Sequence, residues 1–127
     1  MRVVVLLIVA TLMFAVTAVA EEYEQGPNGG LMLDVAGIDA ELLTSGTTVT
    51  INVFDAKSPT PIPTQGYTAA VLIAGPGGRE TLTLVPSGTN SLKGEAKAAI
   101  AQGTTITLTI KTAEGKSGQV KFKKQDK

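Results

Sequence analysis

Apolar and polar residues alternate along most of the chain, in short runs separated by turn-forming residues. In TTVTINVF (residues 47–54), Val49, Ile51 and Val53 alternate with polar residues, and in TTITLTIK (residues 104–111) threonines alternate with isoleucine and leucine. Comparable runs occupy residues 31–36, 38–43, 67–74, 79–86, 91–98 and 119–124. A period of two with one polar face predicts antiparallel β-strands that are each wetted on one side.

Glycine, proline, serine and asparagine separate these runs, as expected of turns. GPGG at residues 75–78 lies between two predicted strands with no helix after it, so we interpret it as a hairpin turn and not as a phosphate cradle. DAKSPTPIPTQG (residues 55–66) is the longest interruption, and its prolines favour an extended crossover between two sheets. About seven or eight short strands at this spacing predict an all-β fold, an antiparallel β-sandwich of the immunoglobulin-like type.

The first twenty residues differ from the rest. Arg2 is followed by an apolar stretch and then by small residues that end at Ala20, the order of a secretory signal peptide. A retained anchor is the alternative, but the acidic residues that follow the stretch do not resemble a stop-transfer signal. We expect residues 1–20 to be a cleaved leader, 21–29 an acidic segment and turn, and 30–127 the β-domain. The exported protein is then periplasmic or secreted, with no stable membrane insertion.

The composition removes several classes of chemistry. The chain has no His and no Cys, which excludes imidazole bases, thiol nucleophiles, disulfides and the usual structural zinc ligands. The chain also lacks an N-glycosylation acceptor, which with the absence of Cys fits a bacterial periplasm. Eleven basic residues balance eleven acidic ones, so no overall field draws nucleic acid. We expect a non-catalytic module that needs no cofactor and binds a protein partner in the envelope.

Carboxylates are the remaining candidates for chemistry. They gather in the first third of the exported chain, where oxygen ligands can hold a metal ion. The candidate metal ligands are Glu24, Asp34, Asp39 and Glu41, and a wider set for weak metal binding adds Glu21, Glu22 and Met32. Two alternative interpretations of these carboxylates remain open. One is that they are solvated acids at strand ends, and the other is that two of them are the paired carboxyl groups of a small hydrolase.

Two further patterns concern the surface of the predicted strands. T-x-T recurs at Thr48/Thr50, at Thr81/Thr83 and through residues 105–109. Threonine suits a half-buried pleated surface, and recognition through a threonine face is the alternative. The lysines of residues 121–127 are interpreted as protection of an edge strand.

The stretch GPNGGLMLDVAGIDAELL (residues 26–43) resembles the start of a small periplasmic module found in heavy-metal RND efflux adaptor proteins. The resemblance rests on Gly26, Pro27, Asn28, Gly29 and Gly30, and extends through Glu41, Leu42 and the proline loop to the closing hairpins. It implies a β-sandwich that is accessory to a metal-efflux assembly. Gln25 and either Ile38 or Asp39 stand where the family tends to carry histidines, so the implied role is protein contact and not capture of soft metals.

The turn itself has a simple interpretation. Pro27 fixes its own φ at the second turn position, Asn28 tolerates the left-handed region, and the two glycines permit a sharp entry to the first strand. We therefore expect residues 26–30 to be a structural turn that starts the fold, with a binding site as the alternative.

Overall fold

The protein is an antiparallel all-β molecule. The structure is a computed structural model that describes residues 24–58 and 60–124, so the expected leader lies outside the described residues. Nine strands and no helix occur in the described part of the chain. The strands are β1 (Glu24–Gln25), β2 (Leu31–Val35), β3 (Ile38–Ser45), β4 (Thr48–Asp55), β5 (Thr68–Gly75), β6 (Gly78–Ser87), β7 (Ser91–Glu95), β8 (Thr105–Lys111) and β9 (Ser117–Lys123).

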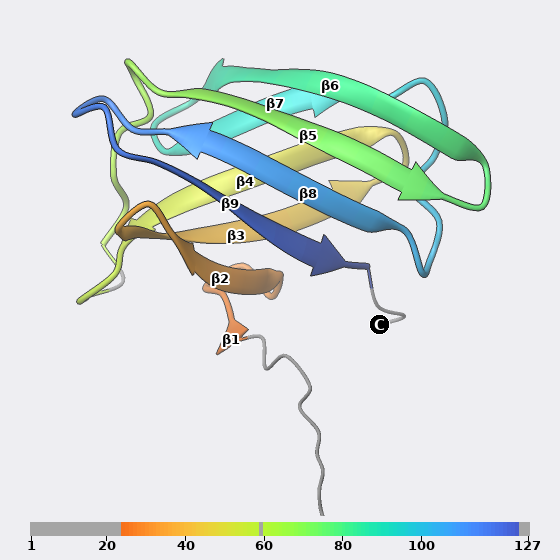
Figure 1. Cartoon of the computed structure of the whole chain (residues 1–127). Helices are drawn as coiled ribbons and strands as arrows, with labels where there is room; N and C mark the ends of the chain where they lie inside the picture. Colours follow the sequence, from red (N-terminus) through yellow and green to blue (C-terminus); the bar gives the residue numbers. More distant parts are fainter. Residues whose placement is uncertain (1–23, 59, 125–127) are drawn as a thin grey trace, which may run out of the picture.

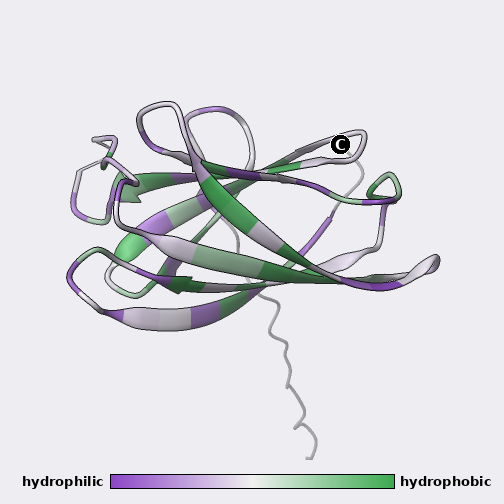
Figure 2. Ribbon diagram, turned by 90° about the horizontal axis from the view of Figure 1, so that it is seen from above, coloured by the Kyte–Doolittle hydropathy of each residue, from purple (hydrophilic) through white to green (hydrophobic). Residues whose placement is uncertain are grey.

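The nine strands form one continuous sheet in the order β1-β2-β3-β4-β7-β6-β5-β8-β9, and all neighbours are antiparallel. The sheet curls on itself. Strands β6, β5, β8 and β9, here called the front layer, lie across the front of Figure 1, and β7, β4, β3 and β2, the back layer, lie behind and below them. Figure 2 shows the two layers from above, with hydrophobic segments in both.

The all-β antiparallel class expected from the alternating pattern is confirmed. The two layers are joined, however, because β6 belongs to both of them. Its first part pairs with β5 up to the Ala69–Leu84 pair, and its last three residues pair with β7 from Val85–Lys93 to Ser87–Ser91. The fold is therefore a half-barrel in which one long strand crosses between the layers, and not two separate sheets.

The apolar residues of the alternating runs meet between the layers. Val49, Ile51 and Val53 of the back layer are fully buried, as are Ile106 and Leu108 of the front layer. The remaining side chains of this core with at most 2% exposure are Ala40, Val71, Leu84, Leu92, Ile110 and Phe122. The strand pattern thus predicted the core face of β4 and β8 correctly.

The run at residues 91–98 was predicted as strand over its whole length, and its second half is not. β7 ends at Glu95, and Ala98 is exposed. The chain leaves the sheet because the amide of Lys97 donates to the carboxylate of Glu80 and the amide of Ile100 donates to the carbonyl of Gly46. These bonds replace a ladder and turn residues 96–104 into a loop at one end of the molecule.

Part of the back layer is buried on both faces, contrary to the expectation of one wet face. Residues 38–42 are all buried, and Asn52, predicted to face water, is only 7% exposed. The proline loop between β4 and β5 crosses from the back to the front layer, as predicted. It also pairs with the end of β4, where Pro61 bridges to Phe54 and the amide of Ile62 donates to the carbonyl of Val53.

The two ends of the sheet approach each other. A Cβ placed on Gly118, near the start of β9, would lie 2.9 Å from Cγ2 of Val35 at the end of β2. At the other end of β9, Nζ of Lys124 donates to Oγ1 of Thr44 in β3. β9 is the last strand in the sheet order, so the interpretation of its lysine-rich sequence as an edge strand is confirmed.

Candidate functional site

The turn at residues 26–30 connects β1 to β2. The amide of Gly29 donates to the carbonyl of Gly26, and the amide of Gly26 donates to the carbonyl of Gly30. Gly29 has φ 86°, so the left-handed position belongs to a glycine and not to Asn28. The arrangement is that of a tight turn followed by a glycine bulge, in which Pro27 occupies the second position.

Asn28 instead supplies hydrogen-bond donors, because this turn encloses the carboxylate of Glu41. The backbone amides of Asn28 and Gly30 donate to Oε2 of Glu41 at 2.8 and 2.9 Å, and Nδ2 of Asn28 donates to Oε1 at 3.0 Å. Glu41 is 0% exposed although it comes from the middle of β3. Burying a carboxylate is costly unless donors surround it, and the turn supplies them.

The two outer glycines are needed for this enclosure. A Cβ on Gly26 would lie 2.5 Å from Cδ of Glu41, and a Cβ on Gly30 would lie 2.2 Å from the carbonyl oxygen of Leu42. Any larger residue at either position would push the turn off the carboxylate. The glycine-bracketed motif is thus explained by close approach to Glu41, and the predicted structural role of residues 26–30 agrees with this geometry.

Glu41 also belongs to a polar row that crosses the back layer. Register places Glu41 opposite Asn52 of β4, and Asn52 opposite Ser91 of β7. Nδ2 of Asn52 lies 3.4 Å from Oε1 of Glu41, and Oγ of Ser91 donates to Oδ1 of Asn52. The row joins the turn to three strands through side chains and shows why Asn52 is buried.

A pair of carboxylates lies one row further along, where Asp34 of β2 faces Asp39 of β3. Asp39 is 9% exposed, and its Oδ1 has no hydrogen-bond partner among the described residues. Burial, a side-chain hydrogen bond with Asp34 and the charges of Asp34, Glu24 and Asp55 raise the pKa of Asp39 to about 7. Near neutral pH the carboxyl group of Asp39 is therefore protonated in part of the molecules.

The four candidate metal ligands are therefore only partly brought together. Asp34 and Asp39 form a pair and Glu24 adds charge nearby, but the oxygens of Glu41 are occupied by the turn. Across residues 24–58 and 60–124, no group of three or more His, Cys, Asp or Glu side chains is arranged to hold a metal ion. Glu21 and Glu22 lie outside the described residues.

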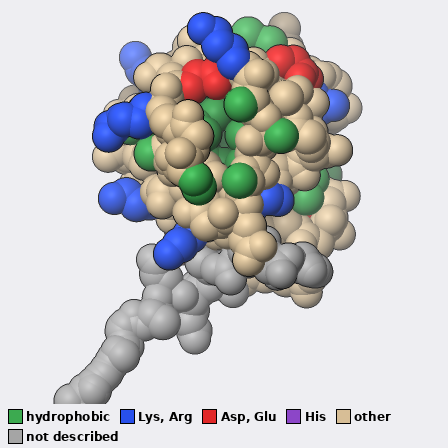
Figure 3. Space-filling view, turned by 90° about the vertical axis from the view of Figure 1, so that its right-hand side faces the viewer, with side chains coloured by type: hydrophobic (Ala, Val, Ile, Leu, Met, Phe, Trp, Pro, Cys, Tyr) green, Lys and Arg blue, Asp and Glu red, His purple; other side chains and the backbone are tan. Residues whose placement is uncertain are grey.

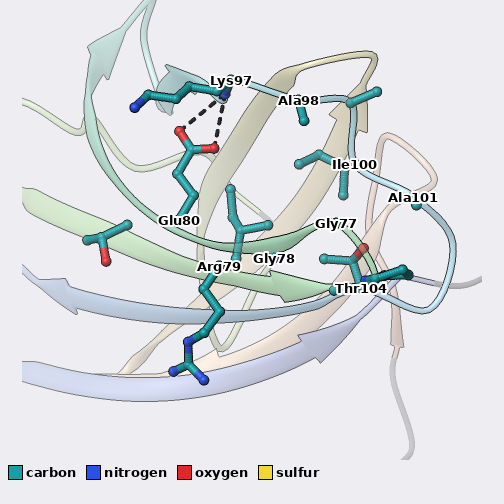
Figure 4. A pocket seen from close by; sticks show the side chains of 14 residues that line it. Gly77, Gly78, Arg79, Glu80, Lys97, Ala98, Ile100, Ala101 and Thr104 are labelled. Carbon is teal, nitrogen blue, oxygen red and sulfur yellow. Dashed lines mark hydrogen bonds between the residues drawn. The ribbon is translucent and has the colours of Figure 1, made fainter.

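An open hollow of about 460 Å³ lies at the end of the molecule, between the β5–β6 hairpin and the loop of residues 96–104. Figure 3 faces this end and shows apolar side chains around the hollow, and Figure 4 shows Ile100, Ala98 and Thr104 lining it. Both carboxylate oxygens of Glu80 accept from the amide of Lys97, at 3.0 and 3.2 Å. The carboxylate of Glu80 thus anchors the loop of residues 96–104. It is the one acidic group among the residues that line the hollow, so the hollow has no pair of carboxylates.

The outer side of the front layer is a further candidate surface. Thr81 and Thr83 of β6 project from it together with Thr105, Thr107 and Thr109 of β8, because β5 pairs in register with both strands. The threonine repeats of β6 and β8, which lie apart in the sequence, are thus assembled on one face, while Thr48 and Thr50 lie on β4 of the back layer. Sequence reasoning noted the repeats but not their convergence, which depends on the non-consecutive pairing of β5 with β8.

Comparison with known proteins gives no relative. No family model, no curated protein and no solved structure matches the chain. Within the described residues, no helix is long and apolar enough to cross a membrane.

Proposed function

We propose that the protein is an exported, non-catalytic binding module of the cell envelope, and that it binds through the outer side of the front layer. The observation that carries this proposal is the charge of that face. Among the described residues of that face, the charged side chains are all basic: Arg79, Lys111, Lys121 and Lys123. The charges of the whole chain balance, so basic side chains that gather on one face create a local positive field there. Such a field attracts an acidic partner.

The rest of the molecule supports a binding role. The signal-like leader supports export, and the absence of His and Cys removes the commonest catalytic groups. The resemblance to efflux adaptor modules suggests an accessory role in a metal-efflux assembly. That role would use contacts between macromolecules, because the best-matched part of the motif, residues 26–30, is committed to holding Glu41.

A second candidate, weak metal binding by carboxylates, is favoured by one observation. Oδ1 of Asp39 is buried beside Asp34 without a hydrogen-bond partner among the described residues. A cation such as Ca²⁺ would use such oxygens. A thermal melt with Ca²⁺, Zn²⁺ or Cu²⁺ tests it: a selective rise in Tm that disappears in Asp34→Asn would support this candidate, and no rise would reject it.

Retention on a carboxylate-bearing cation-exchange resin at pH 7 and low salt tests the leading proposal. A double variant, Lys111→Glu with Lys121→Glu, should elute at clearly lower salt than the wild-type protein. The matched control is Lys57→Glu with Lys93→Glu, which makes the same change in net charge away from the front face. Equal loss of retention in both variants would show that net charge alone matters, and would reject the front face as the binding surface.

A further inference from the structure

The outer side of the front layer has a regular composition that follows from strand register. Each cross-strand row begins on β6 and ends on β9. One row joins Arg79, Ala74, Thr105 and Lys123, and the next joins Thr81, Leu72, Thr107 and Lys121. The third row joins Thr83, Ala70, Thr109 and Gln119, and Nε2 of Gln119 donates to Oγ1 of Thr109.

These rows place two lines of hydroxyl groups on either side of β5. Alternate residues along a strand are about 6.6 Å apart and next-nearest strands about 10 Å apart, so Thr81 and Thr107 lie on opposite sides of β5 at about that spacing. Between them β5 contributes Ala70, Leu72 and Ala74, which are all partly buried. The face therefore carries an apolar strip with a line of hydroxyl groups along each side, and an extended chain can lie along it.

Basic side chains lie at both ends of this strip and along its β9 side. Arg79 stands at one end of the β6 line and Lys111 at one end of the β8 line, where it pairs with Thr68 and Ser117. Lys121 and Lys123 follow the β9 edge. Figure 3 shows basic side chains along its left-hand outline, which is the side of the front layer in Figure 1.

Acidic side chains lie elsewhere among the described residues. Glu80 is the one acid within the four front strands, and it points to the other side of the sheet in register with Ile73. Glu114 lies in the turn beyond β8, and Glu24, Asp34 and Asp39 belong to β1, β2 and β3. A partner on the front face thus meets hydroxyl groups and the positive charges of Arg79, Lys111 and Lys121.

We propose that this face binds an anionic polysaccharide, a chain of sugars that carry carboxylate or sulfate groups. The inference rests on the proposed function and names the chemistry of its partner. Threonine hydroxyls both donate and accept hydrogen bonds, as sugar hydroxyls do, and the basic side chains pair with the acidic groups. A repeating polyhydroxylated anion matches the repeating composition of this face.

Other acidic macromolecules fit this face less well. Protein interfaces depend on buried aromatic, methionine or arginine anchors, and single-stranded nucleic acids depend on aromatic platforms for stacking. The aromatic residues in the described part of the chain, Phe54, Tyr67 and Phe122, are all buried. The exposed large apolar residue found there, Val85, lies past the front layer where β6 joins β7.

Isothermal titration calorimetry of the protein with polygalacturonate and with dextran sulfate tests the inference, with neutral dextran as the reference. Binding to either anionic polymer and not to neutral dextran is expected, and the two polymers separate carboxylate from sulfate preference. Poly-glutamate, duplex DNA and anionic phospholipid vesicles are the competing ligands. Affinity should fall steeply as salt is added, because counterions are released on binding.

Two pairs of variants identify the groups involved. Lys111→Gln with Lys121→Gln should weaken binding by at least about tenfold, and Thr81→Val with Thr107→Val by about tenfold if each lost hydrogen bond contributes its usual share. Lys57→Gln with Lys93→Gln and Thr50→Val with Thr89→Val are the matched controls and should bind like the wild-type protein. Far-ultraviolet circular dichroism confirms that every variant is folded.

The outcomes separate this inference from the proposed function. If poly-glutamate, DNA or vesicles bind more tightly than the two anionic polysaccharides, through the same lysines, the polysaccharide proposal is wrong. The front face then remains the binding surface. Full binding by the threonine variant would also overturn the polysaccharide proposal, since charge alone would then suffice. Absence of binding to both anionic polysaccharides would overturn it outright, and unchanged resin retention in the lysine-to-glutamate variant would remove the proposed function as well.

Discussion

Replacing Asp39 by asparagine is expected to remove a pH dependence of stability that the carboxyl pair on β2 and β3 creates. The pKa of Asp39 is about 7 in the folded protein against an ordinary value of 3.8, so the folded state holds its proton more tightly than the unfolded state. Between these two values the folded state binds more protons. Stability is therefore fully present at low pH and falls as the pH rises towards 7.

The magnitude follows from the difference in bound protons. Stability changes by at most about 1.4 kcal/mol per pH unit for each proton, so the free energy of unfolding should fall by about 2 to 3 kcal/mol between pH 5 and pH 7. This window is selective for Asp39. The ordinary pKa of Glu95 is 4.5, and hydrogen bonds from Thr48 and Thr47 lower this pKa in the folded protein. Glu95 therefore loses its proton below pH 5 in both the folded and the unfolded state.

Urea unfolding followed by far-ultraviolet circular dichroism at pH 5, 6 and 7 measures the effect. Asp39→Asn should give a nearly constant free energy of unfolding over this range and should be more stable than the wild-type protein at pH 7. Asp34→Asn should also reduce the slope, because it removes the facing charge and offers an amide donor to an ionised Asp39. Glu114→Gln, on the exposed β8–β9 turn, is the control. A wild-type protein equally stable at pH 5 and 7, or an Asp39→Asn variant that keeps the slope, would refute this account.

Three further substitutions test other parts of the structure. Glu41→Gln should destabilise the fold by about 2 kcal/mol in urea unfolding, because an amide group replaces an acceptor that Asn28 and the turn amides need; an unchanged midpoint would contradict the structural role of the turn. Ala36→Asn should stabilise by about 1 kcal/mol in the same assay, since this residue has φ 53° and asparagine tolerates that region better; a loss of stability would show that the left-handed conformation is not strained. Glu80→Gln should speed hydrogen exchange at the amide of Lys97 while changing global stability by less than about 1 kcal/mol; exchange at the wild-type rate would mean that this carboxylate does not hold the loop.

The core faces of the strands could be predicted from sequence because they depend only on local alternation. Val49, Ile51 and Val53 had to share a face once their run formed a strand, and all three are buried. The same rule failed for Asn52, because its side chain hydrogen-bonds to Glu41 and Ser91 on the neighbouring strands, and Glu41 is itself enclosed by the turn at residues 26–30. Local periodicity identifies the two faces of a strand but not what packs on each of them.

The candidate sites depend on contacts that no local pattern contains. The carboxylate of Glu41 meets Asn28 thirteen residues away, and the register of β2 against β3 decides that pairing. The threonines of β6 and β8 share a face because β5 pairs with both strands. Gly26 and Gly30 were recognised as turn residues, while the close approach that requires them became visible only with Glu41 in place.

The continuity of β6 has a consequence for the way in which the protein unfolds. Since β6 exchanges ladder hydrogen bonds with β5 along one part and with β7 along the other, neither layer can lose its pairing without loosening a strand of the other. The two halves of the sheet should therefore behave as one cooperative unit, without a partly melted state in which a single layer survives. Amides in β4 and in β8 should exchange with solvent through the same global opening, so that one free energy describes the slowest protons on both sides of the core.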